Sequence, residues 1–225
     1  MITPLKFYEI FEQKKGRRRS LFTKSLVPGK QVYGEKLVTE KGTEYREWNP
    51  NKSKPAAAIM KGLNQFGLKP GDKVLYLGAA SGTTVSHFSD IVGKGGMIFA
   101  LDFAPRVVRD LVSLCEIREN IAPLLEDANK PESYKDKIIH PVDFIFQDIA
   151  QKSQAEIFIK NVEMFLKKGG YCLIAIKARS VDVTKKPSNV FNEVKRFLRE
   201  RVEIVDYREL DPFEKDHAFF VCKKR

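Results

Sequence analysis

The sequence is poor in cysteine and contains one tryptophan and three histidines in 225 residues. Its cysteines, Cys115, Cys172 and Cys222, are odd in number and far apart, a spacing that matches neither a disulfide framework nor a set of zinc ligands. We therefore expect reduced thiols and no metal site. No apolar run approaches the roughly 18 residues of a membrane span, and residues 1–16 are charged where a signal peptide is apolar. These features predict a cytoplasmic protein.

The composition that remains is typical of a folded protein. Hydrophobic residues make up 43% of the chain and charged residues 31%, with 16 Phe and 7 Tyr, which excludes a disordered tail or a low-complexity fibre. At about 150 residues per domain, the length predicts one large domain or one domain with a small appendage.

Positive charge is concentrated near the N-terminus. The chain has 40 Lys and Arg against 29 Asp and Glu, a net charge of +11, and residues 1–54 hold 13 basic and 6 acidic residues. Arg17, Arg18 and Arg19 follow Lys14 and Lys15. Aromatic residues are interleaved further on, at Phe22, Tyr33, Tyr45 and Trp48. This composition suits a polyanion such as nucleic acid, although a solvated basic face explains the charge equally well.

A change of pattern near residue 54 predicts two domains. Before it, short runs separated by glycine and proline turns indicate antiparallel strands at Ser20–Val27, Val32–Val38 and Thr43–Trp48. After it, Lys54–Phe66 is rich in helix formers and follows a possible cap, Ser53. We expect a small basic β-rich domain at residues 1–53 and a larger domain at residues 54–225.

The larger domain alternates apolar strand candidates with polar segments long enough for crossover helices. The candidates are Val74–Leu77, Met97–Leu101, Ala122–Leu125, Val142–Phe146 and Tyr171–Ile176. Such alternation predicts an α/β fold with a parallel sheet covered on both faces. Near the end, Glu203–Arg208 and His217–Lys223 are joined by a loop too short for a crossover helix, which predicts an antiparallel pair at the sheet edge.

Polar or small residues follow each predicted parallel strand, at the edge where such sheets bind ligands. They are Gly78-Ala79-Ala80-Ser81-Gly82-Thr83-Thr84, Asp102, Glu126-Asp127-Ala128, Asp148 and Lys177. Any one acidic residue here is often only a helix cap. Three acidic strand ends, a glycine turn and a lysine in succession are harder to explain as caps alone.

The kind of ligand follows from what the turn lacks. It has neither the Gly-x-Gly-x-x-Gly spacing of dinucleotide sites nor the Gly-Lys-Ser/Thr of a phosphate-binding loop, and acidic strand ends disfavour phosphate. S-adenosylmethionine contains adenosine but no phosphate. Its ribose suits Asp102, its adenine amino group suits Asp127 and its cationic amino acid part suits Asp148, while Phe103 packs on the adenine or belongs to the core.

These residues resemble those of the fibrillarin family, the 2′-O-methyltransferases of box C/D ribonucleoproteins. The match is carried by residues 74–93, Glu126-Asp-Ala128, Asp148-Ile-Ala-Gln151, Ile174-Ala-Ile-Lys-Ala178, Glu214-Lys-Asp-His-Ala218, Trp48-Asn-Pro50 and Ser53-Lys54. It extends from about residue 34 to the end. Pro55 departs from the family pattern, and the arginine/glycine-rich extension of eukaryotic members is absent, so the chain resembles archaeal members.

The resemblance implies a Rossmann-like methyltransferase sheet with a small N-terminal β domain. It also implies a set of residues around S-adenosylmethionine, namely Thr83, Thr84, Asp102, Phe103, Asp127, Ala128, Asp148 and Gln151, next to Gly78 and Ala79 of the turn. The implied partners are a Nop-domain scaffold protein, a kink-turn-binding protein, and the box C/D guide RNA that selects target rRNA or tRNA.

A ribose 2′-hydroxyl is a poor nucleophile, so methyl transfer needs alignment and a proton acceptor. Lys177 is the base that we favour, with Lys54 as a second nearby cation and Asp148 holding Lys177 in place. This set resembles the Lys-Asp-Lys-acid constellation of other RNA 2′-O-methyltransferases, with Asp216 or His217 nearest the fourth place. A structural and a catalytic role both stay open for His217.

For the other two histidines, we expect His87 to pack or cap within its helix and His140 to lie in a loop. Lys185, Lys186, Arg179 and the Arg17–Arg19 run are candidates to follow an RNA backbone.

Other functions remain compatible with the sequence. A non-catalytic RNA-binding or assembly subunit would retain the same fold, and a protein glutamine methyltransferase would use the same cofactor. A nicotinamide-dependent oxidoreductase is the generic alternative for a Rossmann-like sheet, and the glycine spacing disfavours it.

Overall fold

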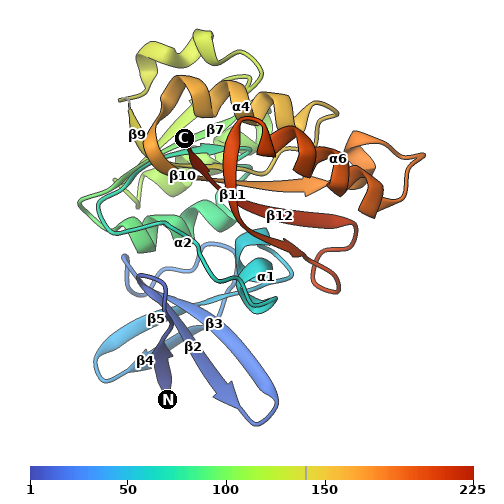
Figure 1. Cartoon of the computed structure of the whole chain (residues 1–225). Coiled ribbons are helices and arrows are strands. Elements are labelled where there is room, and N and C mark those ends of the chain that lie inside the picture. The colour runs from blue at the N-terminus through green and yellow to red at the C-terminus, as the bar shows by residue number, and fades with distance from the viewer. Residues whose placement is uncertain (140) are drawn as a thin grey trace.

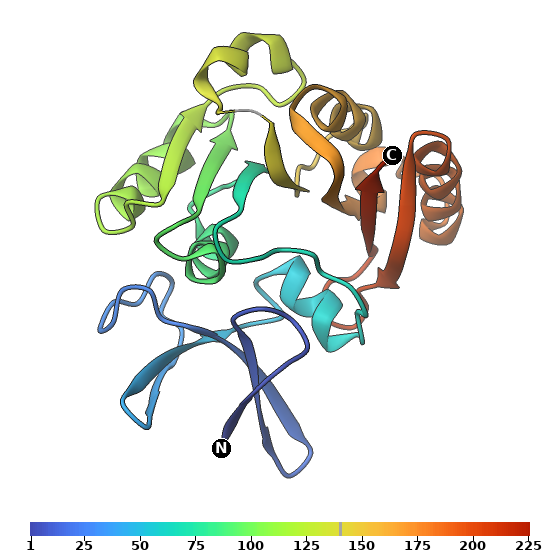
Figure 2. The same cartoon turned by 60° about the vertical axis from the view of Figure 1, so that its left-hand side comes forward.

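Two β-sheets organise the structure, a computed structural model that describes residues 1–139 and 141–225. The expected loop position of His140 lies outside the described residues. Figures 1 and 2 show the smaller, antiparallel sheet packed beside the larger, mixed one, with the N-terminus in the smaller sheet and the C-terminus at the larger one.

The smaller sheet has the strand order β1-β2-β3-β5-β4. Its strands are β1 (Ile2–Pro4), β2 (Ile10–Lys15), β3 (Arg18–Lys24), β4 (Leu37–Glu40) and β5 (Thr43–Trp48). The strand expected at Thr43–Trp48 is confirmed, and that at Ser20–Val27 is confirmed up to Lys24. The sequence pattern did not reveal β1 and β2. In β2 only Ile10 is fully buried, so the alternation that marks a strand is weak.

The strand expected at Val32–Val38 is wrong for most of its length, since only its last two residues belong to β4. The Glu35 carboxylate accepts hydrogen bonds from the backbone N–H groups of Val32, at 3.0 Å, and Tyr33, at 2.9 Å. A side chain that bonds nearby backbone competes with a β ladder for the same donors. These residues therefore form a local turn instead of a strand.

The helix expected at Lys54–Phe66 is shorter than predicted and ends at Met60 as α1 (Lys54–Met60). Gly62 has a φ of +82° and donates its N–H to the Ile59 carbonyl, while Leu63 donates to Ala58. This is the Schellman arrangement that glycine favours at a helix end. Ser53 occupies the cap position, but its side chain forms no cap bond to the helix.

The larger sheet has the order β11-β12-β10-β9-β6-β7-β8. Its strands are β6 (Lys73–Leu77), β7 (Met97–Asp102), β8 (Ile121–Leu125), β9 (Val142–Gln147), β10 (Leu166–Lys177), β11 (Val202–Glu209) and β12 (His217–Lys224). Strands β6 to β10 pair in parallel, and β12 pairs antiparallel with both β10 and β11. The predicted parallel sheet and its antiparallel edge are confirmed.

Both faces of this sheet are covered, as the apolar strands predict. In β6, Val74 and Tyr76 belong to one core cluster while Leu75 and Leu77 belong to the other. The first face packs on α1, α2 (Thr83–Val92), α3 (Pro105–Cys115) and the smaller sheet. The second packs on α4 (Gln154–Phe165), α6 (Pro187–Arg199) and the 3₁₀ helix η1 (Pro131–Lys137). A short helix, α5 (Ala178–Val181), follows β10.

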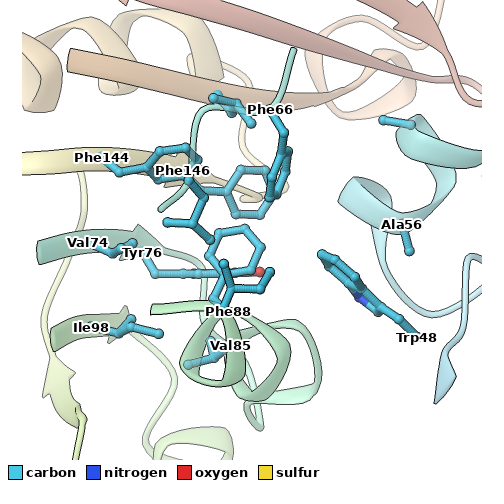
Figure 3. Close-up of a cluster of buried hydrophobic side chains, with 14 of the residues drawn as sticks. Trp48, Ala56, Phe66, Val74, Tyr76, Val85, Phe88, Ile98, Phe144 and Phe146 are labelled. Carbon is cyan, nitrogen blue, oxygen red and sulfur yellow. The ribbon is translucent and has the colours of Figure 1, made fainter. Parts of the chain in front are cut away.

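Trp48 joins the smaller sheet to the first face of the larger one. Its indole stacks on the His87 ring, with centroids 5.1 Å apart, and contacts Phe66 and Phe88 edge-on. Figure 3 shows Trp48 beside the cluster of buried aromatic side chains that includes Phe66 and Phe88. The expectation that Phe22 and Trp48 belong to a polyanion surface is wrong, because both side chains are at most 2% exposed. The smaller and larger sheets share this core, and the domain boundary after residue 53 stays a prediction.

Two further expectations concern the cysteines and membrane-spanning helices. The three cysteines are unpaired in the structure, and burial raises the pKa of the Cys115 thiol to about 11. Within the described residues, no helix combines the length and apolar character needed to cross a membrane.

A buried ion network joins the two sheets around Asp90 of α2. Its carboxylate accepts hydrogen bonds from Arg46 of β5 at 2.7 Å, Arg118 at 2.8 Å, the Thr23 hydroxyl at 2.8 Å and the Leu26 N–H at 3.0 Å. Arg46 also binds Glu35. The side chains of Arg46, Asp90 and Arg118 are fully shielded from solvent. Removing one member would leave a buried charge without its partner.

We expect Asp90→Ala to lower the free energy of unfolding by about 3–5 kcal/mol, because Arg118 and Arg46 lose a buried counter-ion. Urea denaturation measures the change. The control is Glu200→Ala, which removes a carboxylate whose side chain is 70% exposed and is expected to leave the midpoint unchanged. A loss below about 1 kcal/mol for Asp90→Ala would contradict a structural role for the network.

His87 packs at the centre of the same region, as the packing interpretation of the sequence predicts. Its Nδ1 lies 2.8 Å from the Thr23 hydroxyl and its Nε2 lies 2.7 Å from the Tyr33 hydroxyl. Since Thr23 donates to Asp90, Nδ1–H donates to the Thr23 oxygen, and a neutral ring leaves Nε2 as an acceptor. The Tyr33 hydroxyl lies 3.0 Å from the Glu47 carbonyl as well as 2.7 Å from Nε2, and its single proton is shared between these two acceptors. Burial, with the charges of Arg46 and Arg118, holds the pKa of His87 well below its ordinary value.

This pKa predicts a loss of stability on mild acidification. Below about pH 6.5 the unfolded chain protonates His87 and the folded protein does not, so the free energy of unfolding falls as the pH falls, by up to about 1.4 kcal/mol per pH unit. The variant His87→Gln is expected to flatten this dependence between pH 7 and pH 5.5. Equal slopes for the variant and the natural chain, measured by urea denaturation, would show that His87 is not the group responsible.

Candidate active site

The carboxyl ends of β6, β7, β8 and β9 meet at one rim of the larger sheet. The turn after β6 begins at Gly78, whose φ is +85°, and the N–H groups of Gly78 and Ala79 both donate to the Leu101 carbonyl at 2.9 Å. A Cβ atom on Gly78 would lie 2.2 Å from the backbone oxygen of Asp148. Glycine is thus required here by the contact between the ends of β6 and β9.

Asp102 fixes the other end of this turn. One of its carboxylate oxygens accepts the Ala80 N–H at 2.9 Å, and the other accepts the Ala104 N–H at 3.0 Å. A carboxylate oxygen has two acceptor positions, so Asp102 retains acceptor capacity at a half-buried position. Such a group is suited to bind a pair of hydroxyls.

A hollow of about 630 Å³ lies beside Asp102, a size within the range of small-molecule sites. Its walls are Phe103, Leu125, Glu126, Asp127, Lys130, Ser133 and Gln151. Phe103 is 65% exposed and Leu125 is 52% exposed, so the hollow combines apolar surface with polar groups. It brings together three predicted site residues, Phe103, Asp127 and Gln151, and Phe103 is not a core residue.

The remaining predicted cofactor residues are less accessible. Thr83 begins α2 and is half-buried, whereas Ala79, Thr84 and Ala128 are at most 8% exposed. The Thr84 hydroxyl donates to Ser53 at 3.0 Å, and the Ala128 carbonyl accepts from Asn161 at 2.9 Å. The side chains of Ala79, Thr84 and Ala128 therefore lie inside the wall of the rim.

Lys54 and Asp148 form an ion pair at the same rim, with Nζ and Oδ2 3.2 Å apart and each side chain about a quarter exposed. Burial alone would lower the pKa of Lys54, but the charges of Asp148 and Glu214 and the hydrogen bond to Asp148 raise it above its ordinary value. Lys54 is therefore cationic at neutral pH. Glu214 was not predicted to affect this lysine, because contacts across the fold bring them together.

The expectation that Asp148 holds Lys177 is wrong, since its ion pair is with Lys54. Lys177 ends β10 as an exposed side chain and is the direct cross-strand partner of His217. Directly opposed residues of an antiparallel pair project to the same face of a sheet. The structure therefore brings Lys177 and His217 together.

Asp216 and His217 are the two candidates for the fourth position of the constellation. Asp216 is paired with Arg179 at 3.1 Å. His217 lies 2.7 Å from the Lys215 carbonyl through Nδ1. Because a carbonyl only accepts, Nδ1 carries a proton, and a neutral ring leaves Nε2 as an acceptor.

The basic N-terminal run forms the tip of the β2–β3 hairpin. Lys14 faces Arg19 and Lys15 faces Arg18 across the two strands, although like charges in direct opposition are unfavourable. Glu12 binds Arg19 at 2.6 Å and Lys14 at 3.2 Å. The hairpin presents a cationic surface from which the predicted aromatics Phe22 and Trp48 are excluded.

Comparisons with known proteins agree with this geometry. The fibrillarin family profile matches residues 2–225. The fibrillarin-like rRNA/tRNA 2′-O-methyltransferase of Pyrococcus horikoshii is 57% identical over 202 residues, which cover 90% of this chain and 88% of that protein.

Two solved structures are also similar. Aeropyrum pernix fibrillarin in complex with natively bound S-adenosyl-L-methionine has a TM-score of 0.90 at 45% identity, covering 99% of this chain and 97% of that one. A fibrillarin/Nop5p complex has a TM-score of 0.84 at 44% identity, covering 92% and 94%. The Rossmann-like methyltransferase fold with an N-terminal β region, predicted from the sequence, is confirmed.

The close approach of Gly78 to the Asp148 backbone can be tested against a matched glycine. Gly71 has nearly the same φ, +83°, but a Cβ there meets nothing within 4 Å. Alanine at either position incurs backbone strain of about 1–2 kcal/mol. We expect Gly78→Ala to cost clearly more than Gly71→Ala in thermal and urea unfolding, because the ends of β6 and β9 must separate. Equal losses would show that this contact relaxes without cost.

Proposed function

The chain belongs to the fibrillarin family, and we propose that it transfers a methyl group from S-adenosylmethionine to ribose 2′-hydroxyls of rRNA and tRNA. The observation that carries the proposal is the rim itself. The Gly78 turn, the hollow beside Phe103 and the Lys54–Asp148 ion pair come from distant segments and adjoin one another there. The name of the Pyrococcus relative supports the activity, and the ligand of the Aeropyrum protein supports the cofactor.

The residues present fit this cofactor. Asp102 retains acceptor positions for the ribose hydroxyls, Phe103 offers an exposed ring to the adenine, and Asp148 supplies negative charge for the cationic amino acid part. We propose as the full set Gly78, Ala79, Thr83, Thr84, Asp102, Phe103, Asp127, Ala128, Asp148 and Gln151. The buried members shape the wall. When bound, the cofactor supplies an electrophilic methyl group on a positively charged sulfur.

Four side chains of the rim carry the proposed mechanism. The lone pair of Lys177 Nζ would accept the proton of the ribose 2′-hydroxyl as that hydroxyl oxygen bonds to the methyl carbon, while the carbon–sulfur bond breaks and its electron pair stays on the departing thioether sulfur. Lys54 remains cationic and stabilises the negative charge that develops on that oxygen, while Asp148 fixes Lys54. His217, on the same face as Lys177, presents Nε2 as an acceptor that orients the lysine.

We propose that the enzyme works within a ribonucleoprotein in the cytoplasm. The fibrillarin/Nop5p complex supports a Nop-domain scaffold as one partner. A kink-turn-binding protein and a box C/D guide RNA complete the proposed assembly, and the guide selects the target nucleotide. The cationic β2–β3 hairpin is suited to the phosphate backbone of such RNA.

The decisive experiment measures methyl transfer from labelled S-adenosylmethionine to a target RNA in the reconstituted ribonucleoprotein, with the label mapped to one nucleotide. We expect label on a ribose 2′-oxygen. Lys177→Ala is expected to reduce the single-turnover rate by about 10²–10⁴-fold, the usual contribution of a general base. Calorimetry is expected to find unchanged affinity for the cofactor.

Lys168→Ala provides the control, because Lys168 is an exposed lysine at the other end of β10 and its loss is expected to leave the rate unchanged. Label on a base would refute the ribose assignment, and label on a glutamine side chain would favour protein methylation. An unchanged rate for Lys177→Ala would refute the proposed base.

A further inference from the structure

The strand that contains Lys177 extends beyond the strand beside it. β10 continues to Lys177, but β9 ends at Gln147, which pairs with Ile174. Among the described residues, no strand pairs with the edge of β10 that faced β9 beyond Ile174, whereas the other edge remains paired with β12 as far as His217. Buried backbone donors and acceptors need partners, so some other group must replace the missing strand.

The side-chain amide of Gln154 takes that place. Its Oε1 accepts the Lys177 N–H at 3.1 Å, and its Nε2 donates to the Lys177 carbonyl at 3.3 Å. The amide thus binds both backbone groups of one residue, as a neighbouring strand does. Gln154 is the first residue of α4 and is fully buried.

Gln154 is itself held by the end of β9. The Gln147 side chain donates from Nε2 to the Gln154 carbonyl at 2.7 Å, and Gln147 directly precedes Asp148. Through its backbone and its side chain, Gln154 therefore links the end of β9, next to Asp148, to the backbone of Lys177. The relative positions of Asp148 and Lys177 depend on this link.

We propose that Gln154 is a positioning residue for methyl transfer and acts by orienting Lys177. The inference rests on the proposed function, in which Lys177 is the base. Within the described residues, no ion pair or hydrogen bond that the structure records restrains Lys177 Nζ. The placement of Nζ therefore depends on the Lys177 backbone, which Gln154 binds, in addition to the His217 ring on the same face of the sheet. Misplacement of a catalytic group by 1 Å can cost about 10²-fold in rate.

The test uses Gln154→Met, which keeps the length of an unbranched side chain and removes both hydrogen bonds. In the reconstituted ribonucleoprotein, we expect the single-turnover rate at saturating S-adenosylmethionine to fall about 10–100-fold. The dissociation constant for the cofactor and the KM for target RNA are expected to change less than about twofold. Gln154→Glu keeps the acceptor and loses the donor, so we expect an intermediate rate; it also serves as the test if the Met variant does not fold.

A double-mutant cycle separates positioning from general destabilisation. If Gln154 acts through Lys177, adding Gln154→Met to Lys177→Ala causes little further loss of rate, because the group that it positions is already gone. Asn120→Leu is the matched control: it removes a buried amide that binds the Ser89 and Gly93 carbonyls, before β8 and away from the rim. This control is expected to lower stability but not the rate per bound cofactor.

Each outcome decides the matter. The positioning role is overturned if the Gln154 variants have the same single-turnover rate as the unsubstituted protein. It is also overturned if Gln154→Met lowers that rate equally in the unsubstituted protein and in the Lys177→Ala variant. Failure of the natural complex to label any ribose overturns the proposed function instead, and the two failures are therefore distinguishable.

Discussion

A single buried carboxylate fixes how the two sheets sit together. Asp90 receives two guanidinium groups, a hydroxyl and a backbone N–H, from β5, from the segment before β8, from β3 and from the loop after β3. A buried charge is stable only when its partners are in place, so this group admits one arrangement of these segments. The stack of Trp48 on His87 fills the apolar space beside it.

The same constraint reaches the rim through α2, because this helix carries Asp90 and begins at Thr83. Next to Thr83, the Thr84 hydroxyl donates to Ser53, and the Ser53 hydroxyl also accepts from the Trp48 indole at 2.8 Å. Ser53 precedes Lys54. The smaller sheet therefore contacts, through Trp48, the residue that precedes Lys54, whose ammonium group meets Asp148 at the rim.

Residues of the rim are positioned either by the ends of the strands or by the segments packed against those ends. Parallel pairing brings the ends of β6, β7 and β9 together, and the close contact of Gly78 with the Asp148 backbone leaves no room for a side chain. Lys177 is held differently. Strand β10 extends beyond the end of β9, and the backbone of Lys177, the last residue of β10, hydrogen-bonds to a side-chain amide of α4. The backbone of a proposed site residue is thus held by a fully buried side chain from another element.

The sequence by itself determined the alternation of strands and helices, the edge pair and the residues at the strand ends, because burial on both sheet faces imposes apolar runs that end where the chain leaves the core. The signal for the end of α1 was also present, at Gly62. Only the tertiary structure decided that Asp148 pairs with Lys54 rather than Lys177, that Trp48 is buried, and that Gln154 binds the Lys177 backbone. Those contacts join residues far apart in the chain, and a local pattern carries no information about which distant partner a polar side chain will meet.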